Sequence, residues 1–175
     1  IAYKVYVPGN HDTVMEPDPK YFKEECNFHV LYHDTIEIEG LKIFGSPYTP
    51  AFGNWAFNVK RHRLHDYWAA IPEDYDIIAT HGPGKGILDL TDDFDTGKPI
   101  QVGCNALRKR LDNLSPKLHC FGHLHSNPSK GYYNTGAIFN RYWRVNASCV
   151  NDGDMKLHSN GFIYDTTENT IKPVI

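Results

Sequence analysis

No apolar run in the sequence approaches the ~20 consecutive residues needed to cross a bilayer, and no signal peptide is recognisable. The four cysteines form no C-x-x-C pair and are too widely spaced for a zinc knuckle or a dense disulfide framework: Cys26, Cys104, Cys120 and Cys149. We therefore expect free thiols in a reducing, cytoplasmic compartment. The net charge is only −3, so no broad membrane or nucleic-acid surface is expected.

What the sequence does contain is typical of one globular domain, which we expect to span residues 1–175. Hydrophobic residues make up 41% and charged residues 22%, and no repeat or linker divides the chain. The ten histidines are the most informative feature, because imidazole is the commonest metal ligand. Because the chain starts at Ile1 without a methionine, we also expect that an upstream segment has been removed or left out.

The pattern of apolar and polar residues predicts an α/β protein. Strands are expected at 3–8, 28–32, 35–39, 41–45, 75–80, 117–121, 142–147, 161–165 and 170–174, and helices at 20–26, 61–70 and 102–114. Two long segments, 46–60 and 84–100, are predicted as loops, and the first is rich in aromatic residues. Long loops without regular structure are often functional.

Three of the predicted strands run directly into a polar loop with metal-binding side chains: G-N-H-D at 9–12, H-G-P-G at 81–84 and G-H-L-H at 122–125. Neighbouring strands of one sheet would bring these loops together at its edge. Imidazole nitrogens and an amide oxygen suit manganese, iron or zinc. Each motif alone could be an ordinary turn, but the three together predict a metal site. His123 and His125 need a kink between them if both are to reach it.

The order G-N-H-D, histidine, G-H-x-H resembles the calcineurin-like metallophosphoesterases, in which D-x-H and G-D-x-x-D come first. Those two motifs are absent here. The segments 40–50, 53–57, 80–83, 102–104, 117–119 and 145–148 are similar to a subgroup, the metallophosphoesterase-domain proteins of vertebrate brain. Members of that subgroup can carry glycine where this chain has His123. The resemblance implies an αββα sandwich of two mixed β-sheets flanked by helices, lacking its N-terminal βαβ segment here.

The resemblance also implies roles for individual residues. Asn10, His81 and His123 would bind the second of two divalent metal ions, and His125 the first. His11 would protonate the leaving oxygen, with Asp12 orienting it. Manganese is the metal we expect, with iron, zinc, nickel or magnesium open. The first metal's own Asp and His and the carboxylate that bridges both metals match nothing in the chain.

Other side chains are candidates for the surroundings of the site. Tyr48 and Trp55, in the aromatic loop, could stack on a substrate, although aromatic residues in a loop are equally expected to pack on the domain. Asn146 and Ser148 could support the metal ligands from behind.

The function implied is a metal-dependent phosphodiesterase, in which a metal-bridging hydroxide hydrolyses a small phosphodiester such as a cyclic nucleotide. A nuclease acting on DNA or RNA is an alternative, although the acidic charge disfavours long nucleic acids. A catalytically inactive scaffold or partner-binding module of the same fold is the third possibility. No membrane contact is expected, and the sequence predicts no oligomeric state.

Overall fold

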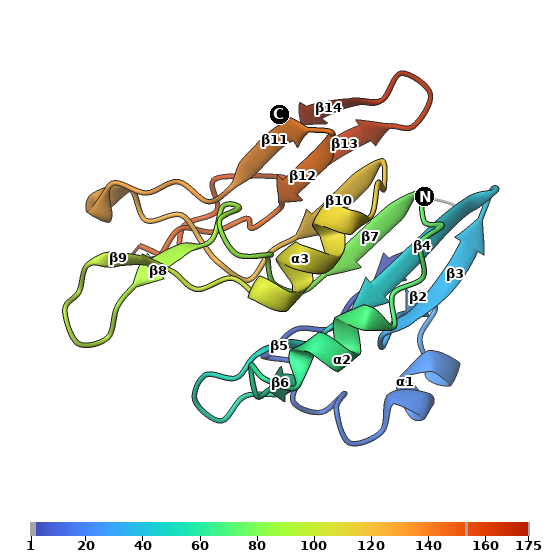
Figure 1. Cartoon of the computed structure of the whole chain (residues 1–175), viewed down its shortest axis with the longest axis horizontal. Coiled ribbons are helices and arrows are strands. Elements are labelled where there is room, and N and C mark those ends of the chain that lie inside the picture. Colours follow the sequence, from blue (N-terminus) through green and yellow to red (C-terminus); the bar gives the residue numbers. More distant parts are fainter. Residues whose placement is uncertain (1–2, 153, 175) are drawn as a thin grey trace.

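A six-stranded mixed β-sheet forms the centre of the computed structural model, which describes residues 3–152 and 154–174 (Figure 1). The strand order across this sheet is β11-β12-β10-β7-β4-β3. Its strands are β3 (Asp34–Ile38), β4 (Leu41–Ser46), β7 (Ile77–Thr80), β10 (Leu118–Phe121), β11 (Gly136–Asn140) and β12 (Tyr142–Asn146).

The four inner strands of this sheet run parallel, and an antiparallel strand closes each edge. Parallel strands end at the same edge of a sheet, so the loops that follow β4, β7, β10 and β12 emerge together. His81 directly follows β7, and Gly122 directly follows β10. The register pairs Ala79 with Cys120, which brings these two loops out side by side.

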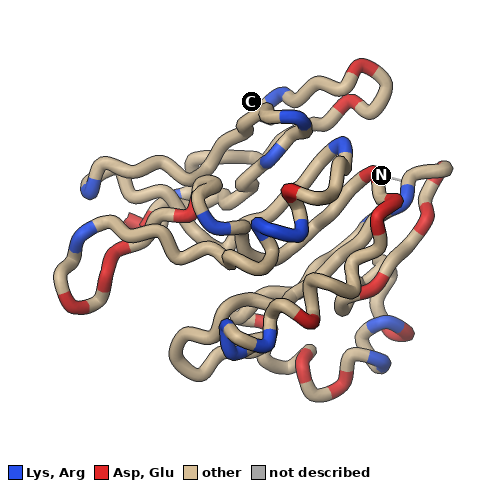
Figure 2. Tube along the Cα trace, in the orientation of Figure 1, with Lys and Arg blue, Asp and Glu red and all other residues tan. Residues whose placement is uncertain are grey.

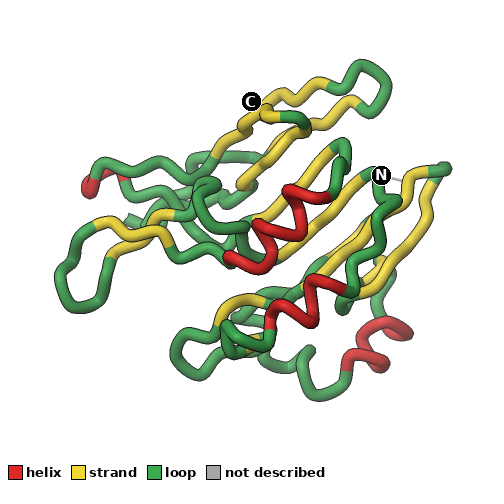
Figure 3. Tube along the Cα trace, viewed as in Figure 1, coloured by secondary structure: helices red, strands yellow, loops and turns green. Residues whose placement is uncertain are grey.

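Two helices, α2 (Leu64–Ala69) and α3 (Asn105–Asn113), cover one face of the sheet (Figures 1 and 3). Leu107 and Leu111 are four residues apart on α3 and are both buried, as an amphipathic helix requires. Cys104 caps this helix, since its Sγ accepts the Leu107 N–H, and it also accepts the Nε1–H of Trp68 from α2. The cysteine thus holds the two helices together above the sheet.

A second, two-stranded parallel sheet lies against the larger one and consists of β1 (Val5–Tyr6) and β2 (His29–Val30). The approach is close, because a Cβ atom added at Gly45 of β4 would lie 2.5 Å from the Cβ of Leu31. Helix α1 (Pro19–Glu25) joins these strands and is capped by the Asp18 carboxylate. The expected α/β class and mixed sheet are confirmed, and β1–β2 represents the second sheet among the described residues.

The remaining elements are short pairs: β5 (Thr49–Pro50) with β6 (Asn58–Val59), β8 (Leu90–Asp92) with β9 (Pro99–Gln101), and β13 (Phe162–Asp165) with β14 (Thr170–Pro173), together with the 3₁₀ turn Pro128–Lys130. The predicted loops at 46–60 and 84–100 are mostly irregular but contain short strand pairs that the sequence did not predict. The five-residue strand β11 (Gly136–Asn140) was not predicted either. Strands of two or three residues are too short to show an alternating pattern. The helices of the described part of the chain are all too short and polar to traverse a bilayer.

His119, in the middle of β10, is a buried imidazole that predicts a loss of stability in acid. Thr80 donates its only hydroxyl hydrogen to the Gly82 carbonyl at 2.8 Å, so His119 Nε2–H donates to the Thr80 oxygen, also at 2.8 Å. Burial, and then the nearby Arg144, lower the pKa of His119 to about 3. Between pH ~6.5 and ~3, His119 is therefore protonated in the unfolded chain and neutral in the folded chain.

We expect this residue to lower the free energy of unfolding by about 1.4 kcal/mol for each pH unit between pH ~6.5 and ~3. His119→Gln should flatten that part of the stability profile, measured by urea unfolding from pH 7 to pH 4. His65→Gln is the control, because the His65 side chain is 80% exposed. Parallel profiles for wild type and His119→Gln would contradict the assignment.

Candidate metal centre

The G-N-H-D segment forms a tight turn after β1 that presents Asn10. The Asp12 carboxylate accepts the Gly9 N–H at 2.6 Å and the Tyr6 hydroxyl at 2.9 Å, and the Asp12 N–H returns to the Gly9 carbonyl at 3.0 Å. Asn10 is buried at 4% exposure. The turn also needs glycine, because a Cβ at Gly9 would lie 2.4 Å from Cε1 of His81.

His81 faces Asn10 across the gap between the two sheets. Its Nε2 lies 2.8 Å from Asn10 Oδ1. The two atoms are hydrogen-bonded in this structure, and two adjacent ligands of one octahedral ion, each at about 2.1 Å, would have a similar spacing of about 3 Å. Burial lowers the pKa of His81 to about 4, and the neighbouring His11 and His125 act in the same direction. The imidazole is therefore neutral at pH 7, as a ligand must be.

His123 sits at a sharp backbone turn that supplies the kink expected in the G-H-L-H motif. Its φ is 71°, and the Leu124 N–H donates to the Gly122 carbonyl at 2.8 Å, which makes a strained γ-turn. The His123 ring lies 4.7 Å from the His81 ring, centre to centre. Burial, followed by the nearby histidines, lowers the pKa of His123 to about 3. The turn thus points a second neutral imidazole at His81.

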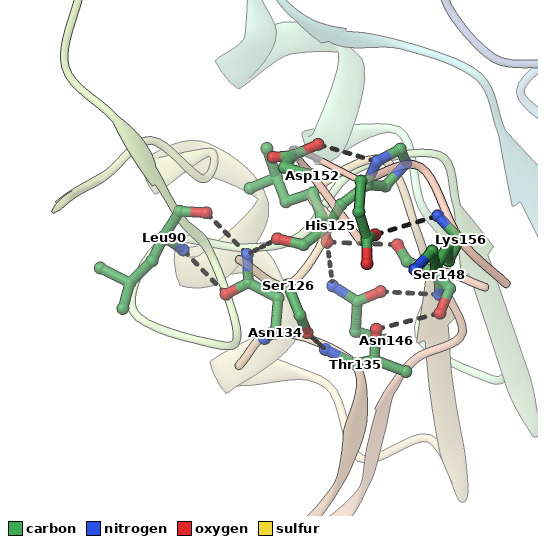
Figure 4. A network of polar contacts seen from close by, with 11 residues as sticks. Leu90, His125, Ser126, Asn134, Thr135, Asn146, Ser148, Asp152 and Lys156 are labelled. Carbon is green, nitrogen blue, oxygen red and sulfur yellow. Dashed lines mark hydrogen bonds and ion pairs between the residues drawn. The ribbon is translucent and has the colours of Figure 1, made fainter. Parts of the chain in front are cut away.

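His125 is oriented by a carboxylate from the loop after β12. Its Nδ1 lies 3.0 Å from Asp152 Oδ1, which leaves Nε2 for another partner (Figure 4). Asp152 was not predicted from the sequence. No motif marked it, because it lies 27 residues beyond its partner and only the fold brings the two together.

Buried amides hold the backbone that carries both histidines of this motif (Figure 4). Asn134 Nδ2 donates to the His125 carbonyl at 2.7 Å, and Asn146 Nδ2 donates to the Leu124 carbonyl at 2.9 Å. The Ser148 hydroxyl donates to the same Leu124 carbonyl at 3.2 Å. Asn134 and Asn146 are at most 1% exposed. Asn146 and Ser148, suggested from the sequence as supports for the ligands, thus hold the backbone between the two histidines and do not contact the imidazoles.

The four predicted donors line one cavity of about 320 Å³ together with His11, Phe52, Trp55 and Asp152: Asn10, His81, His123 and His125. Among residues 3–152 and 154–174, however, no three His, Cys, Asp or Glu side chains form a ready-made cation site. The four donors comprise three imidazoles and one amide, and the bridging carboxylate of the resembled pattern is absent from the sequence. The residues present fit the neutral portion of a metal centre.

Of the other predicted site residues, His11 and Trp55 line the cavity, whereas Asp12 and Tyr48 do not. The exposed His11 ring lies 4.6 Å from the Trp55 ring, and both line the cavity. Asp12 makes no hydrogen bond to His11 in the described part of the chain and instead shapes the turn, so its orienting role stays a prediction. Tyr48 does not line the cavity; its ring packs 4.7 Å from Tyr67. Its proposed substrate contact likewise stays untested.

Comparison with known proteins shows the family of this chain. The calcineurin-like phosphoesterase family matches residues 2–127, which is most of the chain. This chain belongs to the calcineurin-like phosphoesterases. Human metallophosphoesterase domain-containing protein 1 is 30% identical over 182 residues, which cover 86% of this chain and 55% of the human protein.

One further relative of this calcineurin-like phosphoesterase and one solved structure extend the comparison. A probable rhamnogalacturonate lyase C of Emericella nidulans is 36% identical over 144 residues, covering 73% of this chain but only 13% of that protein. A crystal structure with 16% identity superposes with a TM-score of 0.62, over 97% of this chain and 64% of its own length, which shows the shared fold. The chain thus spans about half or less of the curated relatives described here.

The contact between Gly9 and His81 gives a test of this geometry. Gly9→Ala should displace the His81 ring and lower the free energy of unfolding by about 1–3 kcal/mol, the usual effect of overpacking. Gly122→Ala is a matched control in the same centre, because its Cβ would come no closer than 3.7 Å to Ser148 Oγ. It should change stability by less than about 1 kcal/mol. Equal effects of the two substitutions in denaturant unfolding would contradict the packing described here.

Proposed function

We propose that this protein is a metal-dependent phosphodiesterase that hydrolyses a small phosphodiester such as a cyclic nucleotide. The observation that carries the proposal is the convergence of three strand-end loops, which gathers Asn10, His81, His123 and His125 around one cavity. Family membership supports phosphoester hydrolysis in general. The four cysteines are all free thiols, which supports a reducing, cytoplasmic location.

The proposed centre holds two divalent ions, with manganese the first candidate and iron, zinc, nickel or magnesium the others. Asn10, His81 and His123 would hold one ion and His125 the other. The bridging carboxylate and the first metal's own Asp and His match no motif in these 175 residues. When bound, such ions polarise the phosphoryl oxygens and supply a hydroxide nucleophile at neutral pH.

The protein's own side chains have three tasks in this proposal. The buried imidazoles stay neutral at pH 7, so no proton has to be displaced before they bind a cation. His11, exposed at the cavity wall, can donate a proton to the leaving oxygen, which is typically worth ~10²–10⁴ in rate. Trp55, whose ring lies 4.6 Å from the His11 ring, could stack on the substrate beside it.

The charge distribution favours a small ester over a long nucleic acid. Figure 2 shows lysine and arginine interspersed with aspartate and glutamate over the whole trace, without a continuous basic track. A protein that binds a nucleic-acid backbone neutralises several phosphates with clustered basic residues. We therefore keep the nuclease as the less favoured reading.

Loss of either buried imidazole should abolish the reaction. The protein expressed from its complete coding sequence should hydrolyse bis(p-nitrophenyl) phosphate with added manganese, and a chelator should stop it. His81→Ala and His123→Ala should each lower kcat/KM at least 100-fold with the fold retained by circular dichroism, because each removes a ligand. His65→Ala is the exposed control. A near-wild-type rate in either site variant would refute the assignment, and no turnover in wild type would favour the scaffold.

Asp152 should influence metal affinity through His125. Asp152→Ala should raise the dissociation constant for manganese about 10–100-fold, with Asp152→Asn intermediate, because removing a partner that orients a ligating histidine has effects of this size. The measurement is a titration monitored by the electron paramagnetic resonance of free manganese. Asp66→Ala is the control, since that side chain is 88% exposed. Unchanged affinity in Asp152→Ala would show that the contact does not orient a ligand.

A further inference from the structure

A second cavity, of about 260 Å³, adjoins the candidate metal centre. It shares four wall residues with the first cavity, Phe52, His123, His125 and Asp152. The rest of its lining is largely apolar and includes Pro50, Pro83, Val102 and Leu124. A group bound in this second cavity would therefore lie directly beside the donors of the metal centre.

The apolar walls are fixed by hydrogen bonds to their backbone. The Arg61 guanidinium donates to the carbonyls of Val102 at 2.8 Å and Gly103 at 3.3 Å. On the opposite wall, Leu124 is held through its carbonyl by Asn146 and Ser148, both visible in Figure 4. A pre-formed cavity of this kind selects its occupant by shape, because the protein loses little entropy on binding.

The two cavities would each hold a different part of a bound phosphodiester. His11 and Trp55 line the first cavity but not the second. If His11 protonates the leaving oxygen, the leaving group lies on the Trp55 side. The other organic group on phosphorus then points past His123 and His125, into the second cavity.

We infer that the second cavity binds the organic group that remains on phosphorus, and that this group is a flat aromatic ring. This inference rests on the function proposed above. Water forms a new P–O bond, the bond to the leaving oxygen breaks, that oxygen takes up a proton, and a monoester that carries the ring is released. In a cyclic nucleotide the leaving oxygen stays on the sugar of this same monoester, and the ring is its base. The Phe52 ring and two prolines offer flat apolar surfaces, and 260 Å³ is below the 300–1,000 Å³ typical of drug-sized ligands. The cavity thus suits one aromatic or heterocyclic group.

The test compares two esters with the same leaving group, bis(p-nitrophenyl) phosphate and methyl p-nitrophenyl phosphate. Val102→Phe should fill the cavity, and it should lower the ratio of their kcat/KM values, aryl over methyl, about tenfold, as expected when a buried ring is excluded. Val14→Phe makes the same exchange at a side chain that is 69% exposed and should leave the ratio unchanged. An unchanged ratio in Val102→Phe would overturn the inference.

Product inhibition provides a measurement on the wild-type protein, independent of whether Val102→Phe folds. p-Nitrophenyl phosphate should inhibit about tenfold more strongly than methyl phosphate, because only the aryl product fills the cavity. Equal inhibition by the two monoesters, with chelator-sensitive hydrolysis intact, would overturn this inference alone. Absence of chelator-sensitive hydrolysis of both diesters would overturn the proposed function and the inference with it.

Discussion

The parallel pairing of β7 with β10 is the constraint on which the candidate site depends. Because the two strands run side by side and end at one edge of the sheet, His81 and His123 leave the sheet as neighbours although they are 42 positions apart in the sequence numbering. Antiparallel pairing would send the two loops to opposite edges. The same edge receives the loops after β4 and β12, which bring Phe52 and Asp152 to the walls of the two cavities.

Holding these loops requires strained or crowded backbone that other contacts compensate. His123 has a positive φ, which disfavours a residue with a Cβ, yet the adjoining carbonyl of Leu124 is held by Asn146 and Ser148. Buried amides have few alternative partners, so breaking such hydrogen bonds leaves unsatisfied groups and is unfavourable. On the other side of the cavity, Gly9 lets the His81 ring lie directly against the turn. Strain at the site is thus balanced by a rigid polar network behind it.

The sequence was sufficient for the fold class, the helices and five of the six strands of the main sheet, because apolar periodicity marks them. It was also sufficient for the meeting of Asn10 with His81, because each residue follows an apolar strand. It was insufficient for Asp152, whose contact with His125 depends on the path of the loop after β12. The sequence also could not predict which aromatic residues of the loop 46–60 reach the cavity. Trp55 lines it, whereas Tyr48 packs against Tyr67. Pairs such as β5–β6 escaped notice because two residues carry no periodicity.

The charges of the candidate metal ligands constrain which further groups a complete centre would need. Asn10 contributes a neutral amide, and burial disfavours the charged form of His81 and His123, which are therefore neutral at pH 7. Two divalent ions held by neutral groups alone would leave a large uncompensated charge in a half-buried cavity. Carboxylates would offset that charge, and Asp152 lines both cavities and lies 3.0 Å from His125 Nδ1. In the proposed centre the neutral donors would therefore fix the positions of the ions, and carboxylates would balance their charge.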